Sequence, residues 1–120
     1  MANTRVLIVE DDPFIALDLE ATVGDGLDGD AELVVVGSLD EANKAAEAPL
    51  SFALLDIDVI GGKTFALAQA LASRGTPFAF VSGSLPADLP ELLRAVPFVR
   101  KPFSAPEIRR LVENVLNAEA

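Results

Sequence analysis

Five short runs of apolar residues recur along the chain, and each is nearly continuous instead of alternating with polar residues. A strand with one face in water alternates, whereas a strand buried on both faces reads as an unbroken run of branched and aromatic side chains. The runs therefore predict a parallel sheet that is covered on both sides. They span residues 5–9, 32–36, 52–55, 78–81 and 98–99.

The segments between these runs carry signals for helices. Ser38 with Glu41, and Ser104 with Glu107, have the S-x-x-E spacing of a capping box, which satisfies free amide groups at a helix start. Apolar spacing places Phe14, Leu17 and Val23 on a first helix, and Ile108, Leu111, Val112, Val115 and Leu116 on the last. Strand and helix thus alternate five times, which indicates an α/β fold with a doubly wound sheet.

The segment 84–96 departs from this alternation, because Pro86 and Pro90 interrupt it. Proline has no amide hydrogen to donate, and it disfavours helix at the residue before it. We therefore expect only a short, mobile fourth helix, within residues 91–95.

Length and composition limit the class of protein. A chain of 120 residues that is 51% hydrophobic can bury one core, so a single domain over residues 1–120 is predicted. The net charge of −10 repels phosphate backbones, which argues against nucleic-acid binding. The absence of cysteine and histidine excludes disulfides, typical zinc sites and Ser-His catalysis. No apolar stretch has signal-peptide or membrane-spanning character, so a cytoplasmic protein without a membrane partner is expected.

Polar side chains stand where the apolar runs end. Glu10 and Asp11 follow the first run, Asp56 follows the third, and Ser82 and Lys101 stand beyond the fourth and fifth. Because the carboxyl ends of parallel strands share one edge of a sheet, these groups should converge there. Carboxylates about 4 Å apart repel by roughly 4 kcal/mol, so the acids need a counter-ion, and oxygen ligands favour Mg²⁺. Together these five side chains have the chemistry to bind a divalent cation and a phosphoryl group.

Each of these residues also has a simpler interpretation when it is taken alone. The acids Glu10 and Asp11 could be a solvated helix start, and Asp56 could cap a turn. Ser82 and Lys101 could be solvated surface residues. If the site is chemical, Asp56 could be a metal ligand or a nucleophile that forms an aspartyl phosphate. The shared position of all five at strand ends favours the chemical interpretation.

In motif order the whole chain resembles the CheY-like receiver domain of two-component response regulators. The matching segments are VLIVEDD, LLDID, FVSG and VRKPF. The resemblance implies a flavodoxin-like (βα)5 fold with a five-stranded parallel sheet. It also implies a role for each polar residue. Mg²⁺ would be bound by Glu10, Asp11, Asp56 and the backbone carbonyl of Asp58, Asp56 would accept the phosphoryl group, Lys101 would be the family's lysine before a cis proline, and Ser82 and Phe98 would be the switch residues.

The sequence departs from the family pattern at several positions. Ile60 stands where receivers commonly have proline, and Gly61 and Gly62 supply the freedom for a tight turn. Asp58 adds a negative side chain near the acceptor. The segment PFAFVSGS resembles stand-alone receivers that read PFxFATG followed by tyrosine, but Ser82 replaces the threonine and Ser84 the tyrosine. Asp58 could alter the phosphoryl lifetime or the cation affinity, whereas the changes at Ser82 and Ser84 could modify switching without removing phosphorylation.

The resemblance implies a phosphorelay protein, which takes a phosphoryl group from a sensor histidine kinase or a histidine phosphotransfer protein. Because the receiver segments span the sequence, no output domain is expected. Such a chain is not an enzyme in the usual sense, because it catalyses only its own phosphorylation and dephosphorylation. The alternative is a degenerate receiver that binds a protein partner without phosphorylation. A hydrolase of the haloacid dehalogenase type, suggested by DIDV, is disfavoured because the acid cluster precedes Asp56 and no cap domain is present.

Overall fold

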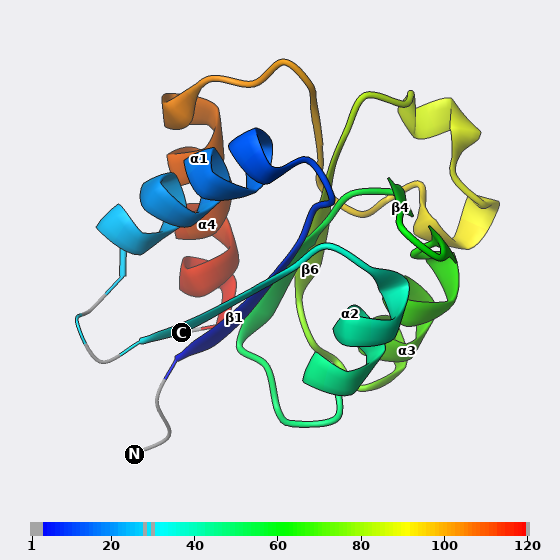
Figure 1. Cartoon of the computed structure of the whole chain (residues 1–120), viewed down its shortest axis with the longest axis horizontal. Coiled ribbons are helices and arrows are strands. Elements are labelled where there is room, and N and C mark those ends of the chain that lie inside the picture. The colour runs from blue at the N-terminus through cyan, green and yellow to red at the C-terminus, as the bar shows by residue number, and fades with distance from the viewer. Residues whose placement is uncertain (1–3, 28, 30, 120) are drawn as a thin grey trace.

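A computed structural model describes residues 4–27, 29 and 31–119, with side chains as far as residue 115. A five-stranded parallel sheet in the order β2-β1-β3-β6-β7 forms its centre (Figure 1). The strands are β1 Arg5–Val9, β2 Glu32–Val36, β3 Phe52–Leu55, β6 Phe78–Ser82 and β7 Phe98–Arg100. The first three have the predicted bounds, and the last two each extend one residue further than predicted.

Helices cover both faces of this sheet (Figure 1). The helices are α1 Pro13–Asp25, α2 Leu39–Ala45, α3 Phe65–Ser73 and α4 Ala105–Glu119. Successive residues of β1 point to opposite faces, so Val6 and Ile8 pack in one core with α1 and α4, while Leu7 and Val9 pack in the other with α2 and α3. Both faces of the central strands are therefore buried from solvent, which confirms the predicted doubly wound architecture. Among the described residues, none of the helices combines the length and the apolar character needed to span a membrane.

The predicted helix starts are confirmed. The Ser38 hydroxyl accepts a hydrogen bond from the Glu41 amide at 3.2 Å, and the Ser104 hydroxyl accepts one from the Glu107 amide at 3.4 Å. The Glu107 carboxylate accepts from the Ser104 amide in return, at 3.0 Å. Four side chains of α4 are buried as expected, namely Ile108, Leu111, Val112 and Val115, whereas the side chain of Leu116 lies outside the described ones.

The first helix turns a different face to the core than its apolar residues suggest. Phe14 and Leu17 lie on α1 as predicted, but they are 83% and 64% exposed. The buried positions are Leu19, Thr22 and Val23. The exposed apolar residues are therefore available for another role.

The fourth crossover has no α-helix. Two single 3₁₀ turns, Pro86–Asp88 and Glu91–Leu93, take the place of the short helix expected at 91–95. Each turn has a proline at its start, which sets the backbone angle but cannot continue the hydrogen-bond ladder of a helix. Buried Leu89 and Leu93 attach the segment to the core.

A small hairpin interrupts the crossover after β3. Its strands are β4 Asp58–Val59 and β5 Gly62–Lys63, which pair antiparallel. The turn between them uses Gly61 and Gly62 at φ of 99° and 140°, where other residues are strained. The predicted tight turn is confirmed, although the hairpin itself was not predicted.

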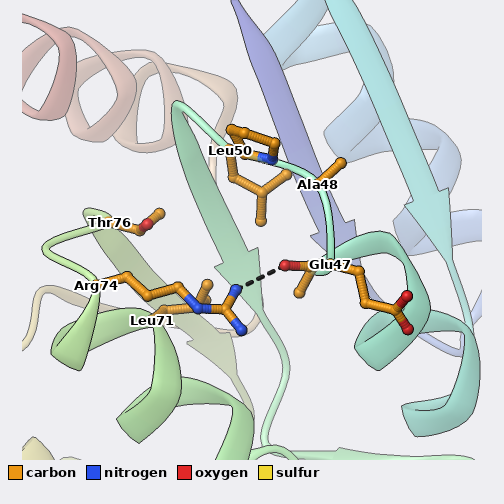
Figure 2. A pocket seen from close by; sticks show the side chains of 8 residues that line it. Glu47, Ala48, Leu50, Leu71, Arg74 and Thr76 are labelled. Carbon is orange, nitrogen blue, oxygen red and sulfur yellow. Dashed lines mark hydrogen bonds between the residues drawn. The ribbon is translucent and has the colours of Figure 1, made fainter.

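Two arginines form hydrogen bonds near the edge of the sheet where the strands begin, which is opposite the edge of the predicted site. Arg74 donates a hydrogen bond to the carbonyl of Ala46 at 2.6 Å across a surface pocket (Figure 2), and Arg5 donates one to the carbonyl of Ala45 at 2.9 Å. Both carbonyls lie at the C-terminus of α2, where unpaired acceptors attract cations. The side chains of Arg74 and Arg5 therefore have a structural role. The pocket lies away from the predicted site.

Candidate functional site

The first and third strands bring two acids to the same edge. The Glu10 amide donates to the carbonyl of Val36 at 2.9 Å, and the Asp56 amide donates to the carbonyl of Val9 at 2.9 Å. These bonds continue the parallel ladder by one residue and fix where each acid leaves the sheet. Carboxylate oxygens of Glu10, Asp11 and Asp56 all lie within 4.8 Å of one another. The predicted acid cluster is therefore present.

Lys101 reaches this cluster from the last strand. Its amide donates to the carbonyl of Ser82 at 2.9 Å, and its ammonium lies 2.9 Å from Asp56 Oδ2 and forms an ion pair with Glu10 Oε1. The side chains of Lys101, Glu10 and Asp56 are only 18%, 1% and 11% exposed, so the charges interact with little screening by water. The peptide bond from Lys101 to Pro102 is cis, as the resemblance to receiver domains implies.

Burial and ion pairing oppose each other at these groups. Burial raises the pKa of Glu10 above its usual value, although hydrogen bonds from Lys101 and from the Asp12 amide act in the other direction. Burial lowers the pKa of Lys101, but its hydrogen bonds to Glu10 and Asp56 outweigh this effect, so that the pKa is raised. Lys101 therefore remains charged at neutral pH and neutralises part of the acid cluster.

The carboxylate of Asp56 is held at both oxygens. Oδ1 accepts a hydrogen bond from the Ile57 amide at 2.7 Å, and Oδ2 accepts one from Lys101. A carboxylate with two fixed donors has a defined orientation, which a nucleophile in an in-line displacement needs. The geometry therefore favours a chemical role for Asp56 over a turn cap.

The other predicted residues lie around this centre. Ser82 is buried at the end of β6, and its hydroxyl accepts a hydrogen bond from the Ser84 amide at 3.3 Å. Phe98 is half-buried in β7, with its ring centroid 6.2 Å from that of Phe80. The side chain of Asp58 is exposed and pairs with Lys63 at 2.5 Å. The metal role of the Asp58 carbonyl and the switch roles of Ser82 and Phe98 remain predictions.

The acid cluster fits a hard divalent cation. It offers three carboxylates from two neighbouring strand ends, and carboxylate oxygens with retained water are the ligands that Mg²⁺ prefers. Asp11 is exposed, which leaves one side of the cluster open to water. Glu10, Asp11 and Asp56 are therefore the residues that could hold Mg²⁺.

Thr64 belongs to the site but was not predicted. Its side chain is fully buried, and its hydroxyl donates to the carbonyl of Asp56 at 2.6 Å. A threonine directly before a helix is typical of an N-cap, so the sequence offers no signal for this contact eight residues back along the chain.

Solved structures identify the fold. The response regulatory domain of mrkE from Klebsiella pneumoniae has a TM-score of 0.81 and 18% identity, covering 96% of this chain and 97% of that one. The CheY-like receiver domain from Methylobacillus flagellatus has a TM-score of 0.77 and 18% identity, covering 95% and 99%. SdrG from Sphingomonas melonis Fr1, a solution structure, has a TM-score of 0.76 and is 30% identical, covering 97% and 99%.

Neither a protein-family model nor a curated protein matches the sequence, so the assignment depends on these structures. They cover nearly the whole chain, and the relative from Sphingomonas melonis reaches 30% identity. The chain belongs to the CheY-like receiver domains of response regulators.

Proposed function

We propose that this chain is a phospho-acceptor receiver, in which Asp56 takes a phosphoryl group from a phosphohistidine of a sensor kinase or phosphotransfer protein. The observation that carries the proposal is the Asp56 carboxylate itself. It lies at a sheet edge, is held at both oxygens, and stands next to two further acids and one lysine. A mere turn cap has no need of this arrangement.

In the proposed reaction an Asp56 oxygen attacks phosphorus while the bond from phosphorus to the histidine nitrogen breaks. The departing imidazole keeps the electron pair of that bond and takes a proton from water. Lys101 donates to a phosphoryl oxygen as negative charge gathers there, and the Ser82 hydroxyl donates to another. Glu10, Asp11, Asp56 and the Asp58 carbonyl would hold a divalent cation, which would supply positive charge to neutralise the acids and the incoming phosphate. The product is an aspartyl phosphate and a free histidine.

Phosphorylation of Asp56 would be transmitted to a partner by a shift of the protein between two packed conformations. A new phosphoryl charge at Asp56 attracts the donors of Ser82 and Lys101, which lie on β6 and just after β7. Phe98 on β7 is only half-buried, so a turn inward would bury more of its ring. The chain would catalyse only its own phosphorylation and dephosphorylation, as a cytoplasmic signalling protein without nucleic-acid or membrane partners.

An apolar rim, defined here as Phe14, Leu17, Ile60 and Leu85, supports a protein as the phosphoryl donor. All four side chains are exposed, by 83%, 64%, 65% and 47%. Phe14, Ile60 and Leu85 stand three to five residues beyond the last residue of β1, β3 and β6, at the edge where the acids lie. Exposed apolar side chains beside a polar centre are typical of protein interfaces. The rim would seat the histidine-bearing partner over Asp56.

The test is the intact mass of the chain after incubation with Mg²⁺ and acetyl phosphate. We expect one phosphoryl adduct, absent in Asp56→Asn and absent when EDTA replaces Mg²⁺. An adduct that persists in Asp56→Asn would contradict the assignment of the acceptor. If the wild-type chain reacts neither with acetyl phosphate nor with histidine kinases, the alternative is favoured, namely a degenerate receiver that binds a partner without phosphorylation.

A further inference from the structure

The Thr64 hydroxyl forms a hydrogen bond outside the helix that it precedes. It stands at the N-cap position of α3, yet in the described part of the chain its side chain makes no capping bond to that helix. The hydroxyl instead donates to the carbonyl of Asp56 at 2.6 Å, and the Thr64 amide donates to the carbonyl of Ile57 at 2.9 Å. Threonine at this position normally stabilises its own helix. Here that bond is replaced by one to the acceptor residue.

The peptide group between Asp56 and Ile57 transmits this contact to the carboxylate. Its carbonyl accepts from the Thr64 hydroxyl, and its N–H donates to Asp56 Oδ1 at 2.7 Å. Because a peptide group is planar, fixing the carbonyl also fixes the direction of the N–H. Thr64 therefore sets the direction of one of the two donors that orient the acceptor carboxylate.

Other contacts hold the far end of the same loop. The carbonyl of Ile60 accepts from the Leu39 amide at 2.8 Å, and Asp58 pairs with Lys63 across the small hairpin. These contacts attach the loop to α2 and close its turn, whereas Thr64 contacts the acceptor residue itself. Its side chain is fully buried, so water does not compete for the bond.

We propose that Thr64 is a positioning residue for phosphoryl transfer, which holds the Asp56–Ile57 peptide group so that the Asp56 carboxylate presents an oxygen to phosphorus. This inference rests on the proposed function of Asp56 as acceptor. It assigns to Thr64 a role in the rate of phosphorylation beyond any role in the stability of the fold.

The test compares Thr64→Val, which keeps the shape and removes the hydroxyl, with Thr64→Ser, which keeps the hydroxyl. With acetyl phosphate and saturating Mg²⁺, we expect Thr64→Val to react about tenfold to a hundredfold more slowly than the wild type, and Thr64→Ser to restore most of the rate. Amide hydrogen exchange gives the second readout. In Thr64→Val the Ile57 amide should lose protection, while the amides of β6 keep theirs.

A wild-type rate in Thr64→Val, or an Ile57 amide as protected as in the wild type, would overturn the inference and leave the proposed function intact. Equal loss of protection at Ile57 and throughout β6 would reduce Thr64 to a structural role and also overturn it. If Thr64→Val does not fold, Thr64→Ala gives the same comparison. If the wild-type chain forms an adduct neither with acetyl phosphate nor with a histidine kinase, the proposed function fails, and the Ile57 exchange still tests whether Thr64 holds that peptide group.

Discussion

Replacing Lys101 with methionine should slow phosphorylation by acetyl phosphate about a hundredfold or more. Methionine keeps most of the side-chain volume but removes the ammonium that lies 2.9 Å from Asp56 Oδ2. In the proposed reaction this ammonium meets the negative charge that develops on the phosphoryl group, and loss of one such donor typically costs this much. The measurement is the rate of adduct formation by intact mass at saturating Mg²⁺.

The same variant should be less stable without a divalent cation. Glu10 and Asp56 are almost fully buried, and Lys101 is the cation between them. Removing one partner of a buried ion pair leaves uncompensated charge and costs about 3 kcal/mol. For a chain of this size that lowers the melting temperature by about 10 °C. Thermal unfolding in EDTA measures the loss, and Mg²⁺ should recover part of it by supplying another counter-charge.

Lys63→Met is the matched control. Lys63 also pairs with an aspartate, Asp58, but both side chains are more than half exposed. Exposed pairs contribute about 0–1 kcal/mol, so this variant should unfold within a few degrees of the wild type. Equal losses in the two variants would show that the cluster around Lys101 is not an unusual concentration of charge.

The strands could be predicted because each is buried on both faces. A strand such as Phe52–Leu55 has no exposed side to carry polar residues, so its apolar run ends where the strand ends. The same fact locates the site, since the first polar residue after the run stands at the sheet edge. Glu10 and Asp56 can be identified in this way from the sequence alone.

The remaining features depend on contacts that spacing does not encode. Apolar residues lie around more than one face of α1, so the pattern identifies a helix but does not separate the buried Leu19 from the exposed Phe14. The fourth crossover depends on how Leu89 and Leu93 meet the core. The role of Thr64 depends on a loop that folds back on Asp56. In each case tertiary packing decides between local alternatives of similar energy.

Replacing Phe14 and Leu17 together with alanine should slow transfer from a protein donor about a hundredfold and leave the reaction with acetyl phosphate unchanged. The two side chains lie one turn apart on α1, and Ala21 continues their exposed face at the next turn. Their burial is small in the free chain, so truncation to alanine removes little from the core. If a partner covers them at the centre of the interface, they become buried apolar anchors, and truncating an anchor of this kind costs about tenfold or more in binding.

The donor for this measurement is the histidine kinase or phosphotransfer protein that phosphorylates the wild-type chain fastest in a screen. We expect the loss in kcat/KM to come mainly from KM, because the site residues are untouched. Leu92→Ala is the matched control, since Leu92 is 84% exposed but lies in the second 3₁₀ turn of the fourth crossover. If Leu92→Ala and the α1 variant lower kcat/KM equally, the partner does not bind specifically to the start of α1. A parallel loss with acetyl phosphate would place Phe14 and Leu17 in the chemistry of the site, and the apolar rim would no longer be evidence for a protein donor.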